Sequence, residues 1–227
     1  MKLVLTCEHG GNVVPKEYVS LFKNNTAVLK THRSFDLGAF DVFNELKALS
    51  NFSKSNTISR LLIELNRSLH HKHLFSEFSK NLSITEKQYL IDQYYLPYRN
   101  DIENIIKSYI EQGETVIHLS VHSFTPILNN VKRNCDIGLL YDSTNKIEKQ
   151  FCKQLKNSIK KLNPDLNVRY NYPYLGKADG FTTYLRKRFP ENYLGIELEI
   201  NQKFSNNNKI DSSIKQTLFA ALSQVID

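Results

Sequence analysis

Apolar residues occur along the chain in two patterns, short continuous runs and helical repeats, and the two patterns alternate. Residues 3–6 form a short apolar run that stops at a turn-forming segment, 8–12, which predicts a buried strand. From Asp36 onward apolar residues recur at a spacing of three, which predicts an amphipathic helix whose first turn is capped by Asp36. Residues 57–65 are apolar and β-branched, and they predict a second strand.

The same alternation continues toward the C-terminus. A long helical stretch is predicted from about Thr85 to Gln112, where Pro97 should break or kink the helix and Gly113 should close it. Further strands are predicted over 115–121, 136–141 and 192–200, and further helices over 147–162 and 212–225. This order predicts an α/β sandwich with a mixed or mostly parallel sheet. Residues 1–227 are predicted to form a single domain, with 70–114 as a possible helical excursion from the sheet.

The composition fits an ordinary globular chain of 227 residues, of which 41% are apolar and 23% charged. At this length folding buries roughly 70% of the surface, so a core can form without disulfides. The three cysteines lack C-x-x-C spacing, which favours a reducing compartment over a disulfide framework or a cysteine-rich zinc site. The N-terminal apolar run is too short for a signal peptide, and no run reaches the roughly 18 apolar residues of a membrane span. We therefore expect a soluble, cytoplasmic protein that does not associate with membranes.

The formal net charge of +7 suggests an acidic partner only if the basic residues are concentrated. They are spread along the chain, and the densest cluster is 186–188. We interpret the surplus as a solvated basic surface and expect no nucleic-acid partner. The alternative is a non-catalytic basic binding module, which would retain nucleic acid in a salt-dependent way that weakens when Arg186 or Lys187 is removed.

Reactive side chains gather at the ends of the predicted strands, where ligands bind in open α/β sheets. The residues in question are Glu8 and His9, Asn66 and Arg67, His122 and Ser123, and Glu197 and Glu199. Two histidines and a carboxylate on separate strand ends match the protein ligands of a catalytic zinc, which keeps one position open for water. Each residue alone is more often structural, but their coincidence at strand ends predicts a site.

Other candidates carry less weight. His70, His71 and His73 cluster in a polar stretch without an H-E-x-x-H motif, His32 is a candidate for supporting the site, and His118 is expected to be packed and neutral. Nucleophilic catalysis has no G-x-S-x-G motif to support it, and a Cys7 thiolate near His9 remains a minor alternative. Phosphate-binding glycine loops are also missing from the sequence.

Several motifs occur in the order seen in one protein family. They are Cys7-Glu8-His9-Gly10-Gly11-Asn12 with Pro15, His32 with Asp36-x-Gly38-Ala39, Ser59-Arg60-Leu61 leading to Leu65-Asn66-Arg67, His122-Ser123-Phe124-Thr125-Pro126, Arg133 with Asp136-Ile137-Gly138-Leu139, Asn171-x-Pro173-Tyr174, and Glu197-x-Glu199. As an ordered set, these motifs resemble the N-formylglutamate amidohydrolase-like proteins. The resemblance extends from residue 3 to about residue 204.

The resemblance implies a relative of the zinc-dependent exopeptidases, with a mixed, mostly parallel sheet covered by helices on both faces. It implies a metal-dependent hydrolase of a carbon–nitrogen amide bond, which in the family's reference reaction frees formate from N-formyl-L-glutamate. His9, His122 and Asp36 then look like the metal ligands, with Glu8 as the alternative to Asp36. The exopeptidases place two ligands as H-x-x-E, whereas the third position after His9 is Asn12 here.

The resemblance also suggests which residues handle substrate. Asn66-Arg67 is similar to the Asn-Arg pair that holds a substrate carboxylate in the exopeptidases, and a planar guanidinium suits that contact. Arg67 would also stabilise the developing oxyanion, and Arg60, Arg133 and Ser123 are further candidates for substrate binding. Glu199 looks like the general base, with Glu197 as its alternate, because residues two apart on a strand share a face.

The leading hypothesis is therefore a zinc-dependent N-acyl-amino-acid amidohydrolase that binds one Zn²⁺ per chain, or another divalent metal in its place. A related zinc amidase or carboxypeptidase acting on another N-acyl amino acid or small peptide is the alternative. The expected partner is a small-molecule substrate, and the sequence leaves the oligomeric state open.

Overall fold

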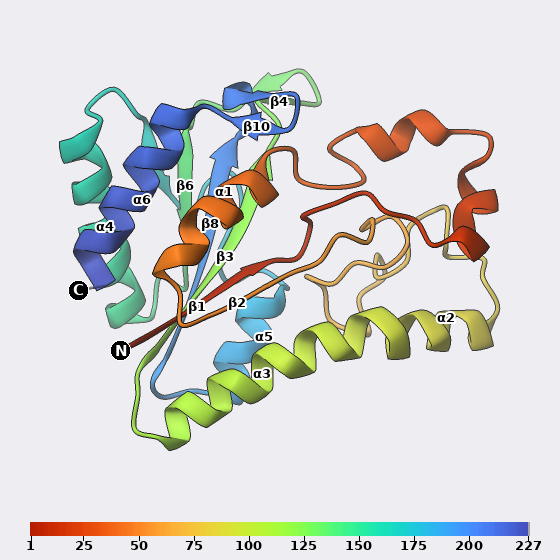
Figure 1. Ribbon diagram of the computed structural model, residues 1–227, viewed down its shortest axis with the longest axis horizontal. Coiled ribbons are helices and arrows are strands. Elements are labelled where there is room, and N and C mark those ends of the chain that lie inside the picture. The colour runs from red at the N-terminus through yellow and green to blue at the C-terminus, as the bar shows by residue number, and fades with distance from the viewer. Residues whose placement is uncertain (227) are drawn as a thin grey trace.

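The computed structural model describes residues 1–226, and its centre is a six-stranded sheet in the order β2-β1-β3-β8-β6-β7 (Figure 1). The strands are β1 (Lys2–Cys7), β2 (Phe52–Ser55), β3 (Val116–Phe124), β6 (Ile137–Leu140), β7 (Val168–Tyr170) and β8 (Tyr193–Asn201). The first four neighbours, β2, β1, β3 and β8, run parallel, whereas β6 is antiparallel to β8 and parallel to β7. The prediction of an α/β fold with a mixed, mostly parallel sheet is confirmed.

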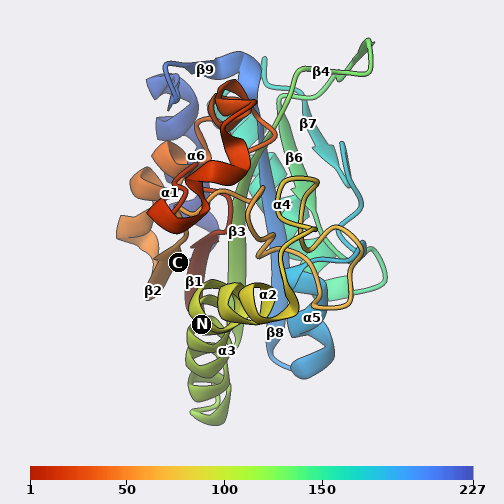
Figure 2. The ribbon, with the colours of Figure 1, turned by 90° about the vertical axis from the view of Figure 1, so that its right-hand side faces the viewer.

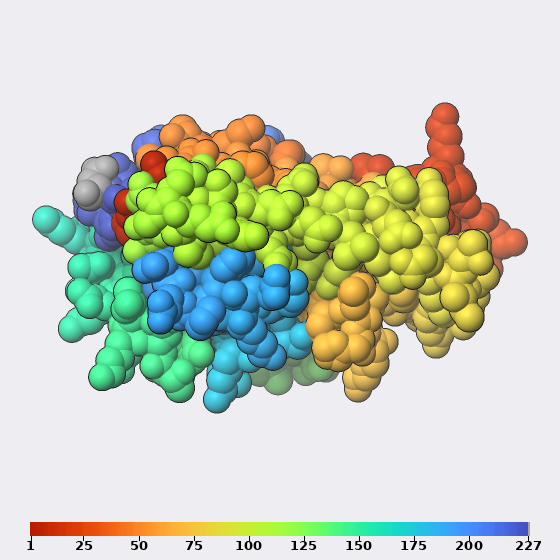
Figure 3. Space-filling view, turned by 90° about the horizontal axis from the view of Figure 1, so that it is seen from below, coloured from red at the N-terminus to blue at the C-terminus, as the bar shows by residue number. Residues whose placement is uncertain are grey.

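Helices cover both faces of this sheet (Figures 1 and 2). They are α1 (Ala39–Leu46), α2 (Ile84–Leu90), α3 (Leu96–Glu111), α4 (Lys146–Leu162), α5 (Phe181–Arg188) and α6 (Ser212–Ile226), with short 3₁₀ turns at Lys16–Phe22, Thr26–Lys30, Lys47–Leu49 and Gln202–Phe204. Side chains alternate across β1, so that Leu3 and Leu5 pack with α1, α4 and α6, while Val4 packs on the opposite face with α3 and α5. Figure 3 shows the outer surface of that opposite layer, where α5 lies beside α3.

The predicted long helix is present and is interrupted just before Pro97. Between α2 and α3 the backbone forms a π turn, Ile91–Tyr95, and Pro97 lies in the first turn of α3. Proline cannot donate to the carbonyl four residues earlier, so a change of hydrogen-bond pattern is expected at this point. Gly113 follows α3 in the left-handed region, with φ of +82°, and closes the helix as predicted.

The strand predicted over 57–65 is wrong. This segment consists mainly of turns, and only Ile58 makes an isolated parallel bridge, to Val13. Its apolar residues are nevertheless buried one after another, because the segment passes beneath α3 and the loops around the site. A continuous buried run looks the same in sequence whether it is a strand or an irregular segment. The neighbour of β1 is instead β2, which is polar and only partly buried.

Other short elements have no clear apolar pattern and were not predicted. They are β7, α5 and two hairpins, β4 (Ile127–Leu128) with β5 (Val131–Lys132) and β9 (Ser205–Asn206) with β10 (Lys209–Ile210). Asn129 and Asn130 join β4 to β5, and both have positive φ, which is typical of a two-residue hairpin turn. The β4–β5 hairpin extends away from the body of the molecule (Figure 2).

The basic cluster at 186–188 does not form one exposed patch. The Arg186 side chain is only 12% exposed, and its Nε donates to Glu148 Oε1 at 2.8 Å. Arg188 forms an ion pair with Glu103. These contacts join α5 to the neighbouring helices. Within residues 1–226, no helix combines the length and the apolar character needed to cross a bilayer.

Candidate metal centre and pocket

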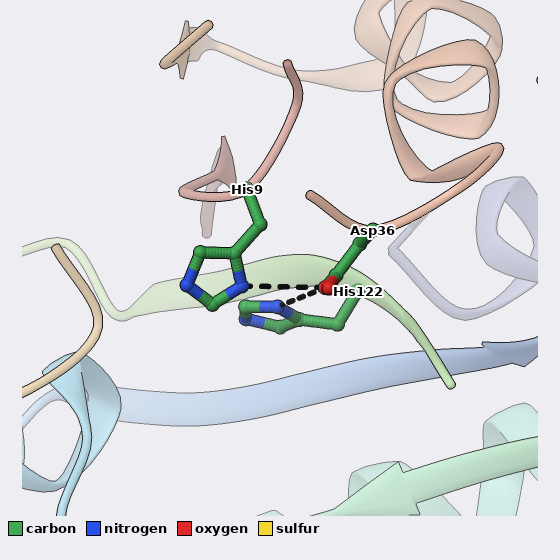
Figure 4. Close-up of side chains that lie close together, drawn as sticks. All are labelled: His9, Asp36 and His122. Carbon is green, nitrogen blue, oxygen red and sulfur yellow. Dashed lines mark hydrogen bonds and ion pairs between the residues drawn. The ribbon is translucent and has the colours of Figure 1, made fainter. Parts of the chain in front are cut away.

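Three side chains from separate elements converge at the carboxyl edge of the sheet (Figure 4). His9 lies two residues after the end of β1, His122 lies near the end of β3, and Asp36 lies in the loop before α1. Asp36 Oδ2 is 3.3 Å from His9 Nδ1 and 3.0 Å from His122 Nδ1. All three residues are buried, and their ligand atoms lie within 4.8 Å of one another. Two imidazole nitrogens and a carboxylate oxygen are the donor set of a catalytic zinc site.

Asp36 is held in place by backbone contacts and does not cap α1, contrary to the sequence prediction. The helix begins after Gly38, whose φ of +80° makes the turn, and Asp36 makes no side-chain capping bond to it. Instead, the Asp36 amide donates to the His9 carbonyl at 3.0 Å, and its Oδ2 accepts from the Ser123 amide at 3.3 Å. The carboxylate is thereby directed toward the two histidines.

The far nitrogen of each imidazole also meets a carboxylate. His9 Nε2 contacts Glu64 Oε1, and His122 Nε2 lies 3.3 Å from Glu8 Oε2 and 2.8 Å from Ser120 Oγ. A carboxylate at one ring nitrogen fixes the tautomer and leaves the other nitrogen free to bind a metal, an arrangement common around protein metal sites. Both Nδ1 atoms are therefore oriented toward the shared centre.

This arrangement explains the position of Glu8, the alternative ligand. Its side chain is fully buried behind His122, accepts from the Tyr98 hydroxyl at 3.1 Å and accepts from Ser120. It faces the outer nitrogen of His122 and lies away from the point where the three ligand atoms meet. The geometry thus places Asp36, and not Glu8, with the two histidines.

Glu64 was missed by the sequence analysis, because the incorrect strand over 57–65 gave it no special position. Arg60 lies between Glu64 and Asp36: its Nε donates to Glu64 Oε2 at 2.8 Å and its Nη1 donates to Asp36 Oδ1 at 3.2 Å. The one available signal was the spacing, since Glu64 stands four residues after Arg60 and two before Asn66.

The charge of this cluster suits a bound cation. Burial alone would raise the pKa of Asp36, Glu8 and Glu64, yet the neighbouring histidines, and Arg60 beside Asp36 and Glu64, hold all three pKa values well below their ordinary range. Burial lowers the pKa of His122, but its hydrogen bonds to Asp36 and Glu8 outweigh this and raise it well above the ordinary value. Three ionised carboxylates therefore attract positive charge to the two imidazoles. A divalent cation bound by the two Nδ1 atoms would balance the negative charge of these carboxylates.

A pocket of about 240 Å³ opens above the three ligand residues. It is lined by nine of the eleven predicted site residues: His9, Asp36, Arg60, Asn66, Arg67, His122, Ser123, Glu197 and Glu199. The two others, Glu8 and Arg133, do not line it. Side chains that sequence reasoning did not select, among them Tyr174, Asp179 and Gln202, complete the wall.

Two glutamates reach the pocket from β8, as expected for residues two apart on one strand. Glu199 pairs in register with His122 on β3 and is 4% exposed. Within the described residues its Oε2 is buried without a hydrogen-bond partner, and burial raises its pKa to about 8. Glu197 instead accepts from the Thr182 hydroxyl at 2.9 Å. A buried, unpartnered carboxylate with a raised pKa is suited to exchange protons with a ligand.

The Asn66-Arg67 pair is fixed by contacts on its far side. Asn66 Oδ1 accepts from the Phe181 amide at 2.7 Å, at the start of α5, and Arg67 Nη1 donates to the Asp179 carbonyl. The Arg67 carbonyl accepts from the Tyr95 hydroxyl at 2.7 Å, which ties it to the π turn. The helical layer therefore sets the orientation of both side chains in the pocket.

Two predicted substrate-binding residues are already engaged within the protein. Arg133 donates to the Tyr174 hydroxyl at 3.2 Å and lies behind that side chain. The Ser123 hydroxyl donates to the Leu37 carbonyl at 2.8 Å and accepts from Gln202 at 3.0 Å. Ser123 lines the pocket, but its hydroxyl fixes neighbouring loops.

The remaining histidines lie outside this cluster. His118 is buried, bonded to Thr6 and to Tyr193, and burial lowers its pKa to about 4, so it is neutral as expected. The ring centroids of His71 and His73 are 5.6 Å apart on an exposed loop, with the two rings tilted by 53°. Among residues 1–226, only the group of His9, Asp36 and His122 has the spacing to hold a metal.

Comparison with known proteins places the chain in a family. The model of the N-formylglutamate amidohydrolase family matches residues 1–205. A gene product of Agrobacterium tumefaciens has a similar solved structure, with a TM-score of 0.81 and 22% identity over 100% of this chain and 92% of that chain. The N-formylglutamate amidohydrolase of Ralstonia eutropha has a TM-score of 0.70 and 16% identity over 100% and 94%. No curated protein matches the sequence significantly.

The two solved structures show that the fold is shared, and the family model extends over most of the sequence, including every residue of the pocket described above. The chain therefore belongs to the N-formylglutamate amidohydrolase family and is a hydrolase of that type.

Proposed function

We propose that the protein is a zinc-dependent hydrolase that cleaves the amide bond of an N-formyl amino acid, or more broadly of an N-acyl amino acid. The observation that supports this most strongly is the convergence of His9, Asp36 and His122, with a carboxylate on the far nitrogen of each histidine. Membership of the family supports the amide bond as the target. The pocket supports a small-molecule substrate by its size.

His9 Nδ1, His122 Nδ1 and Asp36 Oδ2 would hold the metal. Zinc bound there supplies a water with a pKa of roughly 7 and polarises the scissile carbonyl. The positive charge of a bound metal would favour the ionised form of Glu199, whose free Oε2 would take the proton of the attacking water and then deliver it to the leaving nitrogen. Glu197 remains the alternate base, but its bond to Thr182 makes it the weaker candidate.

Asn66 and Arg67 would bind the carboxylate of the substrate. A guanidinium carries five N–H donors, and the contact of Arg67 with Asp179 uses only part of them. Arg67 lines the same pocket as the ligand residues, so the substrate would lie between the metal and the guanidinium. The same side chain would then stabilise negative charge that develops on the carbonyl oxygen.

The proposal is tested by metal analysis combined with a substrate panel. We expect about one zinc per chain after gentle purification, release of formate or acetate from formylated or acetylated amino acids, loss of activity with a chelator, and recovery when zinc is restored. Hydrolysis of small peptides but not of N-acyl amino acids would favour the carboxypeptidase alternative. Folded, active protein that contains no metal would refute the proposal.

Replacement of Glu64 by glutamine should weaken metal binding by about 10- to 100-fold, because the charge that supports His9 is lost while the shape of the side chain is kept. Chelator competition measures the affinity, and circular dichroism checks the fold. Glu77→Gln is the matched control, since Glu77 pairs with Arg33 on the surface and does not line the pocket. Equal metal affinity in the two variants would show that Glu64 does not support the site.

A further inference from the structure

The pocket offers a second substrate carboxylate little to bind. Arg60, one of the two arginines suggested for that role, is held by Glu64 and Asp36, and both of these carboxylates are buried. The other, Arg133, donates to Tyr174 and to Thr125 and does not line the pocket. Arg67 remains, and one guanidinium is needed for the α-carboxylate that every N-acyl amino acid carries.

The other charges in the pocket give a dianion no net attraction. Four carboxylates and two guanidinium groups line it, from Asp36, Asp179, Glu197, Glu199, Arg60 and Arg67. His32 also lines the pocket, but burial together with Arg33 and Arg60 lowers its pKa, so it is not a cation near neutral pH. Together with a bound divalent cation these charges sum to about zero, so a second substrate carboxylate would find no surplus of positive charge in the pocket.

The mouth of the pocket carries three large apolar side chains beside the exposed His32, whereas its floor is polar. The ligand residues and Glu199 are buried at the bottom, whereas Leu128, Tyr174 and Leu175 are 38%, 47% and 56% exposed and line the same pocket. Leu128 reaches the pocket from the protruding β4–β5 hairpin (Figure 2). An aliphatic side chain that projects from a substrate bound at the floor would cover these groups and remove them from water.

We propose that the preferred substrates are N-formyl amino acids with an apolar side chain, such as N-formyl-L-leucine, and that N-formyl-L-glutamate is a poorer substrate. This inference rests on the proposed function and names the substrate class of the same site. Leu128, Tyr174 and Leu175 would contact the side chain, while Arg67 binds the α-carboxylate.

The test compares kcat/KM of the zinc-loaded protein for the N-formyl derivatives of L-leucine, L-glutamate and L-glutamine. We expect kcat/KM for the leucine derivative to exceed that for the glutamate derivative by about 10-fold or more, which is the scale on which apolar pockets discriminate between substrates. Glutamine should lie between them, because it removes the charge of glutamate without adding apolar surface. A glutamate value equal to or above that of leucine would overturn the inference and leave the proposed function intact.

A pair of variants locates the preference. Leu128→Lys places a cation at the mouth of the pocket. It should lower the ratio of kcat/KM for N-formyl-L-leucine to kcat/KM for N-formyl-L-glutamate by about 10-fold. Ile127→Lys is the matched control: Ile127 is the adjacent residue of the hairpin, is 60% exposed and does not line the pocket. Equal ratios in both variants would contradict the role of Leu128. If neither N-formyl nor N-acetyl amino acids are hydrolysed, the proposed function itself fails, and this inference with it.

Discussion

Asp36→Asn should lose bound zinc and reduce kcat/KM by about three orders of magnitude or more, because both water activation and carbonyl polarisation depend on the metal. Asparagine has nearly the same shape, but it lacks the charge that faces the two Nδ1 atoms. If Asp36 were only a helix cap, the same change would leave both stability and activity almost unchanged, because asparagine caps a helix as well as aspartate does. Metal content by elemental analysis and the rate with an N-formyl amino acid distinguish these outcomes.

Asp41→Asn is the matched control for this variant. Asp41 lies in the first turn of α1, accepts from the Ile210 amide at 3.0 Å, and pairs with Lys209 and Lys215. It does not line the pocket, so its replacement should lower stability while zinc content and activity are retained. If the Asp36 variant keeps its full complement of zinc, another residue must supply the third ligand.

The two histidines could be predicted because they depend on a general property of parallel sheets. β1 and β3 are parallel neighbours, with Thr6 in register with Ser120, so the residues after each strand meet at one edge. β8 continues the same arrangement and brings Glu199 beside His122. The strand pattern predicts that these residues lie at the same edge of the sheet, and the order of the strands brings them into contact although they are far apart in the sequence.

The carboxylates that hold the two histidines in place were much harder to predict. Glu64 and Glu8 act through long-range contacts with single imidazole nitrogens, and no local periodicity marks such contacts. The error over 57–65 concealed Glu64, since a buried irregular segment and a buried strand have the same apolar pattern. The role of Asp36 was also open in the sequence, because an aspartate before a helix fits a cap as well as a ligand.

The interpretation of the arginines changed for a similar reason. Sequence alone counts Arg60 and Arg133 as available cations, whereas the fold pairs Arg60 with Glu64 and Asp36 and leaves Arg133 outside the lining of the pocket. Charge available to a substrate is therefore a property of the assembled pocket. This difference leads from the family's reference substrate to the apolar side chain proposed here.

Glu199→Gln should reduce kcat by about 10²- to 10⁴-fold while zinc remains bound, because the variant cannot accept a proton but leaves the three ligand residues unchanged. Glu197→Gln should have the smaller effect, since that carboxylate is already bonded to Thr182. Steady-state rates are compared at equal zinc content. A larger loss in the Glu197 variant would reverse the two assignments.

The same variant has a second readout in metal-free protein. Burial raises the pKa of Glu199 from about 4.5 to about 8, so between these pH values the folded protein holds a proton that the unfolded chain has released. The free energy of unfolding of the wild type should therefore fall relative to that of Glu199→Gln as the pH rises through this interval. Below pH 4.5 the difference between the two proteins should stay constant. Urea unfolding at several pH values measures the difference. A constant difference across this range would show that Glu199 is ionised at ordinary pH even without metal, and the carboxylate would then be available as a base throughout.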